Sequence, residues 1–147
     1  MKVLKRLMMI ILSTTAAICL FACVNSGARE KQASLREEFN LALGETNTIE
    51  PDDITLHFLE VAQDDRCPSQ ADCEYAGLAL VVIEVTLADS EQFQLEFNTS
   101  PWPDTNLQAI NKLGYLFELV RLDPYPEHPN NPIQSEDYRA IMVVRKE

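Results

Sequence analysis

Glycine and histidine are scarce in this chain of 147 residues, which contains only four glycines and two histidines. A phosphate-binding loop needs several glycines and a lysine, and no such loop occurs. A nucleophilic site pairs a serine or cysteine with a base, most often histidine, and the chain offers only His57 and His128. Neither a Gly-x-Ser-x-Gly elbow nor a His-Glu-x-x-His motif is present. The sequence therefore predicts a protein that is not an enzyme.

Basic residues are also few, with 12 lysines and arginines against 23 aspartates and glutamates and a net charge of -11. Binding to nucleic acid requires clustered basic side chains that displace counterions, so this class of function is excluded. The apolar content of 46% is ordinary for a folded chain. At this length we expect one domain.

Apolar runs are short as well. The uncharged run at residues 7–22 falls short of the ~20 apolar residues that span a bilayer. It follows the basic residues Lys2, Lys5 and Arg6, and this order is typical of a bacterial export signal. We expect residues 1–22 to be a signal-peptide helix, and a retained signal anchor is the alternative.

The signal ends in Leu20-Phe21-Ala22-Cys23, which resembles the lipobox of bacterial prolipoproteins. The resemblance implies that Cys23 becomes the N-terminus, with a diacylglycerol on its thiol and an acyl chain such as palmitate on its amino group. Several acyl chains anchor a protein far more firmly than one. With Val24 next to the cysteine, the resemblance implies the bacterial cell envelope, at the outer-membrane periplasmic face or the cell surface of a Gram-negative cell. Cleavage at another site is the alternative.

Removal of the signal makes the net charge more negative, because three of the 12 basic residues lie in the signal. The remaining chain carries nine basic and 23 acidic side chains, a net of -14. Anionic headgroups repel such a surface, so the lipid must hold the protein at the membrane. Residues 23–37 are predicted to be the acylated cysteine and a flexible tether, and residues 38–147 the folded domain.

Apolar residues alternate with polar ones in most of the mature chain, as in strands with one buried face. This alternation predicts strands at 39–43, 54–58 and 93–97, and 115–122 and 138–145 are further candidates. The nearly continuous, β-branched apolar run at 78–87 predicts a central strand covered on most of both faces, in a hairpin of residues 77–98. A turn is expected at 44–47, and 99–112 and 123–136 read as long loops. All eight prolines lie outside these strands, as they must because proline cannot donate to a ladder. The pattern predicts an all-β fold, an antiparallel β-sandwich (Ig-like or Greek-key) of about six to eight strands, or an open barrel.

Four cysteines are present, of which Cys19 lies in the predicted signal and Cys23 is the acylation site that the lipobox resemblance implies. Cys67 and Cys73 remain, and an even remainder in an exported chain predicts one local disulfide. Closing so small a ring stabilises the fold by ~2.4 kcal/mol in the chain-entropy model. A zinc site is the competing interpretation, but the histidines are not at ligand spacing. We expect no metal and no cofactor.

Residues 64–77, Asp-Asp-Arg-Cys-Pro-Ser-Gln-Ala-Asp-Cys-Glu-Tyr-Ala-Gly, resemble a motif in a family of small exported bacterial proteins and lipoproteins. Those proteins carry Asp-x-Arg-Cys-Pro, a second cysteine and an aromatic-Ala-Gly step into a strand. They also tend to have Pro-Tyr-Pro late in the chain and a last strand opened by Asp-Tyr, which residues 124–126 and 137–138 match. The family has no assigned activity, so the resemblance implies fold and export only.

The motif reads as a tight corner. Gly77 can adopt backbone angles that other residues cannot, and the Tyr75 ring can cover the disulfide. Arg66 can pair with one of four neighbouring carboxylates. The candidate binding residues are Asp64, Asp65, Arg66, Asp72, Glu74, Trp102, Tyr125 and His128. Two interpretations stay open for the charges: solvated residues on an ordered corner, or a site for a cation or a basic partner. The cluster lacks the ligand ladder of an EF-hand.

We expect a monomeric, acidic, non-catalytic binding or structural module, held at the membrane by its lipid and facing an envelope protein partner or ligand of unknown identity. Loops on a rigid sandwich are the usual carriers of function, and Trp102 either anchors a partner or caps the sandwich. A protease inhibitor that presents a rigid stapled loop is one alternative. A hydrolase that uses paired carboxylates is another.

Overall fold

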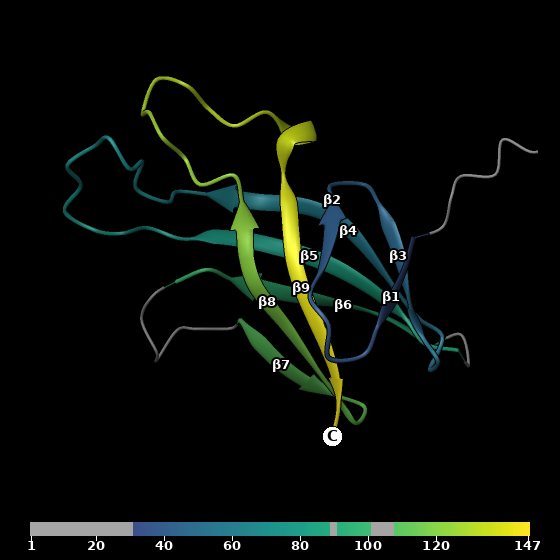
Figure 1. Ribbon diagram of the computed structural model, residues 1–147. Helices are drawn as coiled ribbons and strands as arrows, with labels where there is room; N and C mark the ends of the chain where they lie inside the picture. Colours follow the sequence, from purple (N-terminus) through teal and green to yellow (C-terminus); the bar gives the residue numbers. More distant parts are fainter. Residues whose placement is uncertain (1–30, 89–90, 101–107) are drawn as a thin grey trace, which may run out of the picture. The chain divides into compact units, whose positions relative to one another are not determined.

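The computed structural model describes residues 31–88, 91–100 and 108–147, and the predicted signal helix and Cys23 lie outside these residues. The described residues form nine strands and one short 3-10 helix (Figure 1). The strands are β1 (Lys31–Ser34), β2 (Phe39–Ala42), β3 (Thr46–Glu50), β4 (Ile54–Asp64), β5 (Ala79–Thr86), β6 (Gln92–Asn98), β7 (Ala109–Lys112), β8 (Tyr115–Asp123) and β9 (Arg139–Lys146). The 3-10 helix η2 spans Ser135–Asp137. Within these ranges, no helix has the length and apolarity to cross a membrane.

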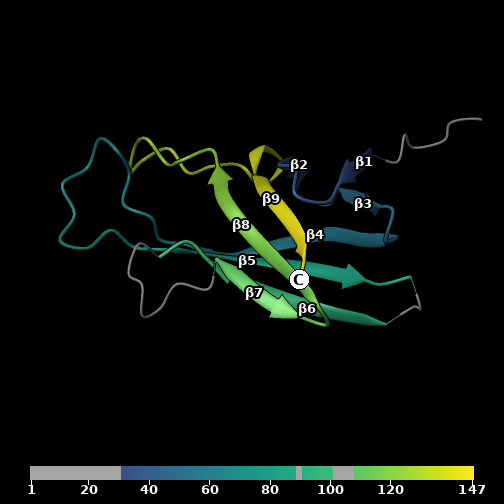
Figure 2. The ribbon, with the colours of Figure 1, turned by 60° about the horizontal axis from the view of Figure 1, so that its bottom comes forward.

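The strands form two sheets, one with the order β1-β3-β4-β5-β6 and one with the order β2-β9-β8-β7. All strand pairs are antiparallel except β1 with β3, which is parallel. The strands β8 and β9 cross over β4 and β5 from the other sheet (Figure 2). The predicted all-β sandwich with one disulfide is therefore confirmed, and it includes the predicted hairpin of β5 and β6.

One hydrophobic core lies between the sheets. In β5 every second residue is buried, and β4 alternates in the same way up to Phe58. Full burial of one such side chain stabilises the fold by about 1.5–3 kcal/mol. The largest fully buried side chains come from both sheets: Phe58, Phe97, Phe117, Leu41, Ile49, Ile54, Leu56, Ile83, Leu119, Met142, Val81 and Val85.

Three strands lie where the sequence predicts a turn, a tether or a loop. The turn contains Gly44, whose φ is +78°, but β3 already begins at Thr46, inside the range predicted as a turn. The strand β1 lies in part of the predicted tether. The strand β7 lies in the predicted loop 99–112. These three strands are mostly polar, so the hydrophobic alternation that marks the others is missing from them.

Two connections meet at one end of the sandwich, on the left of Figures 1 and 2. We call residues 65–78, which join β4 to β5, the disulfide loop. We call residues 124–134, which lead from β8 to η2, the proline loop. The backbone N–H of Ser69 donates to the carbonyl oxygen of Pro126 (2.9 Å), and that of Gln70 to Glu127 (3.0 Å). The two loops therefore form one loop end, held together by backbone hydrogen bonds.

Candidate functional site

Arg66 lies at the centre of the loop end, with its side chain only 5% exposed. Its Nε and Nη2 donate to the two carboxylate oxygens of Asp64 at 2.8 and 2.7 Å, a bidentate pair. Its Nη1 donates to the carbonyl oxygen of Leu122 (2.7 Å), and Nη2 also donates to that of Pro124 (2.9 Å). One guanidinium thus joins the end of β4, the end of β8 and the proline loop.

Tyr138 completes this cluster from the start of the last strand. Its hydroxyl donates to Asp64 Oδ2 at 2.9 Å. Burial alone would raise the pKa of the Asp64 carboxyl, but the hydrogen bonds and charge of Arg66, aided by Tyr138, hold that pKa below its ordinary value. Burial and the hydrogen bond to Asp64 raise the pKa of Tyr138 to about 12. At neutral pH the cluster therefore contains a carboxylate, a guanidinium and a neutral phenol.

Tyr125 covers the cluster on the outer side. The guanidinium carbon of Arg66 lies 5.2 Å from the centre of the Tyr125 ring, within cation–π distance. Tyr125 itself is 51% exposed. Its ring therefore contacts the buried cation and still presents surface to solvent.

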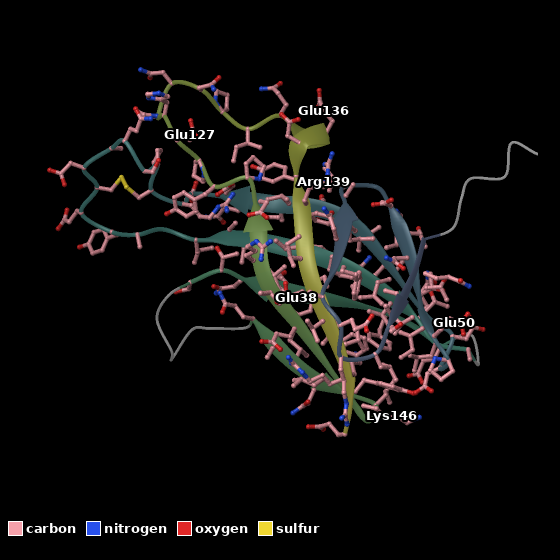
Figure 3. All side chains as sticks on the ribbon, in the orientation of Figure 1. Glu38, Glu50, Glu127, Glu136, Arg139 and Lys146 are labelled. Carbon is pink, nitrogen blue, oxygen red and sulfur yellow. A yellow bond between two sulfur atoms is a disulfide. The ribbon has the colours of Figure 1, made fainter. Side chains whose placement is uncertain are left out.

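The disulfide loop is closed twice at its base and once near its tip. The N–H groups of Asp65 and Cys67 donate to the carbonyl oxygens of Leu78 and Ala76, each at 2.8 Å. The predicted bond between Cys67 and Cys73 is present, and Figure 3 shows it at the tip of the loop. The loop is therefore a stapled hairpin extension of β4 and β5.

Gly77 occupies the corner where this loop enters β5. Its φ is +66°, and a Cβ at this position would lie 1.8 Å from the carbonyl oxygen of Asp65. A side chain is therefore excluded both by backbone conformation and by space, and the role expected for Gly77 is confirmed. Tyr75 is 74% exposed, so little of its surface is available to cover the disulfide as expected.

The other candidate residues have different surroundings. Asp65 is exposed and accepts a hydrogen bond from the Gln63 side chain. Asp72, Glu74 and His128 are exposed on the two loops. Trp102 and Cys23 lie outside the described residues. The loop end thus brings together Asp64, Arg66 and Tyr125 in direct contact and leaves the other carboxylates at its surface.

Among the described residues, three shallow hollows lie around the loop end. The largest, about 300 Å³, is bordered by Arg66, Gly77 and Tyr125. A second of about 250 Å³ lies between the proline loop and η2, and a third of about 200 Å³ lies over Asp64 and Tyr138. Within residues 31–88, 91–100 and 108–147, no three histidines, cysteines or carboxylates are grouped closely enough to hold a metal ion.

A second polar cluster joins the two sheets elsewhere. Asp52, in the turn between β3 and β4, accepts hydrogen bonds from the Tyr115 hydroxyl (2.6 Å) and Lys146 Nζ (2.7 Å). The hydrogen bond from Lys146 and that from Tyr115 lower the pKa of Asp52, and the same bonds raise the pKa values of the two donors. The phenol of Tyr115 is therefore held protonated, which suits a structural tie and not a nucleophile.

Two residues that lie at or next to the loop end, Tyr138 and Glu127, are not among the candidates from the sequence. Tyr138 appears there only in the Asp-Tyr pair of the resemblance, and its partner Asp64 is 74 residues away. No sequence motif around Glu127 points to a role, although its carbonyl oxygen accepts a hydrogen bond from Gln70 of the disulfide loop. The Asp-x-Arg, Pro-Tyr-Pro and Asp-Tyr segments, distant in the sequence, thus meet around Arg66.

Comparison with known proteins found no matching protein-family model, no matching curated protein and no matching solved structure.

Proposed function

We propose that this chain is a lipid-anchored lipoprotein of the bacterial cell envelope and that its loop end is a non-catalytic surface for binding an envelope protein. The observation that carries the proposal is the buried Arg66, which fixes two long loops through Asp64 and two carbonyl oxygens. Loops fixed before binding lose little entropy when a partner docks. This network of hydrogen bonds around Arg66 favours binding of a partner, because its buried polar groups are already paired with one another and the loops need not rearrange.

The surface of the loop end is acidic and aromatic. The two loops carry the exposed carboxylates of Asp65, Asp72, Glu74 and Glu127, while their one arginine, Arg66, is buried against Asp64. Tyr75 and Tyr125 are exposed between these charges. Exposed tyrosines are frequent anchors in protein interfaces, and the carboxylates select a partner of opposite charge.

The lipobox supports the anchored part of the proposal. Seven residues separate Cys23 from the start of β1 at Lys31, and a chain of this length reaches at most ~25 Å. An acylated Cys23 would keep the domain near the membrane. The intact mass of membrane-extracted protein should correspond to a chain starting at Cys23 plus diacylglycerol and one acyl group. A different start without lipid would remove the anchor from the account.

Capture from native envelope tests the binding surface. The full chain, tagged at its C-terminus, is crosslinked in cells, and captured proteins are identified by mass spectrometry. The double variant Asp72→Lys and Glu74→Lys reverses charge on the disulfide loop, and Glu60→Lys with Glu96→Lys does so on exposed positions of β4 and β6. We expect the loop variant to lose a partner that the wild type and the control variant both retain. Equal capture by all three would exclude the loop end as the binding surface.

A protease inhibitor is a second candidate, favoured by one observation. Tyr75 is 74% exposed on a loop that a disulfide and backbone hydrogen bonds hold rigid, which is the arrangement of a preorganised ligand for a protease cleft. Inhibition of proteases that prefer aromatic residues, with loss of inhibition in Tyr75→Ala, would support this candidate. Uniform inactivity against such a panel would reject it.

A further inference from the structure

The hollow of about 250 Å³ beside the proline loop is lined by both apolar side chains and carboxylates. Pro124, Tyr125, Pro132 and Ile133 supply apolar surface, and Glu127 and Asp137 supply carboxylates. No lysine, arginine or histidine lines it. We call this space the acidic hollow. It is too small for a helix or strand of a partner and suits one long side chain.

Hydrogen bonds from neighbouring segments fix the backbone that lines the acidic hollow. Arg66 holds the carbonyl oxygen of Pro124, and the disulfide loop holds that of Glu127 through the N–H of Gln70. Asp137 ends η2, where its N–H donates to the carbonyl oxygen of Gln134 (3.0 Å). The hollow is therefore formed before any partner arrives.

The two arginine side chains near the acidic hollow, Arg66 and Arg139, make their contacts elsewhere. Arg66 borders the neighbouring hollow and lies over the Tyr125 ring, but it does not line the acidic hollow. Arg139, at the start of β9, donates to the carbonyl oxygens of Glu136 and Tyr138 at 2.7 and 2.8 Å. Figure 3 shows Glu127 on the proline loop, Glu136 at η2 and Arg139 at the start of β9. The charge of the hollow is thus negative.

We infer that the acidic hollow receives an arginine side chain from a basic segment of the partner protein. The methylene stem of arginine packs on proline and isoleucine surface, and its guanidinium forms charge-assisted hydrogen bonds with carboxylates. The planar head also stacks on an aromatic ring, here the exposed part of Tyr125, which lysine does less well. The inference rests on the proposed binding function and names the chemistry of its partner.

The test uses the full chain, labelled with 15N in detergent micelles, and the probe peptide acetyl-Gly-Arg-Gly-amide. Amide chemical shifts are followed during titration with this peptide and with the same peptide carrying citrulline, an uncharged isostere of arginine. We expect shifts confined to residues 124–137 with the arginine peptide and none with the citrulline peptide.

Two double variants locate the contact. Glu127→Gln with Asp137→Asn removes the charge of the acidic hollow, and Glu60→Gln with Glu96→Gln removes the same charge from exposed strand positions. We expect the first to weaken binding of the arginine peptide about tenfold and the second to change it less than about twofold. Equal weakening by both variants, equal binding of citrulline, or no binding would each overturn the inference. If envelope capture through the loop end persists in those cases, the proposed function stands and only the arginine assignment is wrong.

Discussion

Tyr138 donates its hydroxyl proton to Asp64 at 2.9 Å across 74 residues of sequence. This bond joins the residue just before β9, in one sheet, to the last residue of β4, in the other. Because Asp64 also holds both arms of the Arg66 guanidinium, the bond fixes the orientation of the residue on which the loop end depends. The chemistry of this pair makes the stability of the domain sensitive to pH at both extremes.

At alkaline pH the phenol of Tyr138 is the sensitive group. Its pKa is raised to about 12, so the folded state favours the protonated phenol. This contribution to stability is complete below the ordinary tyrosine pKa of about 10 and is lost as pH rises toward 12. We expect the thermal unfolding midpoint to fall over this window. In Tyr138→Phe the fall should be smaller. The remainder comes from Tyr115 and Lys146, whose pKa values are also raised by Asp52, and Tyr75→Phe should behave as the wild type.

At acid pH the lowered pKa of Asp64 gives the opposite dependence. A carboxyl whose folded pKa is depressed stabilises the fold above its unfolded pKa of about 3.9, and that stability disappears as pH falls through the folded value. Asp64→Asn should therefore reduce the loss of unfolding free energy between pH 5 and pH 2. An unchanged acid dependence in this variant would mean that the ion pair with Arg66 does not form.

Removal of the buried Arg66 guanidinium should be among the most destabilising polar substitutions in the described domain. Arg66→Ala leaves the largely buried Asp64 carboxylate without its counter-charge and two carbonyl oxygens without the guanidinium donor, a change that costs about 3 kcal/mol. Arg66→Lys retains the charge but not the bidentate geometry, and we expect an intermediate loss. Urea unfolding of the three proteins gives the order directly, and equal stability of wild type and Arg66→Ala would contradict the structure.

Gly77→Ala should be costly for a steric reason. The new Cβ would collide with the carbonyl oxygen of Asp65, so the hairpin base must open or the corner must move. Gly114→Ala is the matched control, because Gly114 has φ +81° but open space around it. We expect a loss of about 1 kcal/mol for the control and clearly more for Gly77→Ala, measured by thermal unfolding.

The disulfide should contribute to stability and to the acidic hollow together. Cys67→Ser with Cys73→Ser removes a ring closure worth ~2.4 kcal/mol and loosens the loop that fixes Glu127. Urea unfolding should show this loss, and the arginine peptide should bind the variant more weakly. Full retention of peptide binding would show that the disulfide loop does not shape the hollow.

Sequence periodicity predicts the strands that bury one face, such as β6 and the first half of β4, because their apolar side chains alternate. The strand β5 is predicted from its continuous, β-branched apolar run. It fails for β3, whose Thr46 and Asn47 resemble turn residues although Asn47 is only 2% exposed in the structure. The disulfide follows from cysteine arithmetic. The hydrogen-bond partners of Arg66 could not be predicted in this way. Two of them are backbone carbonyl oxygens 56 and 58 residues away, and every residue type carries such an acceptor.

Site-specific photocrosslinking in living cells tests the central claim, that the loop end is the binding surface, most directly. A photoreactive residue replaces Glu74 on the disulfide loop, Glu127 on the proline loop or Glu96 on β6, one at a time. Adducts with the same envelope protein should form from positions 74 and 127 and not from position 96. Adducts from position 96 alone, or from all three positions equally, would contradict the claim.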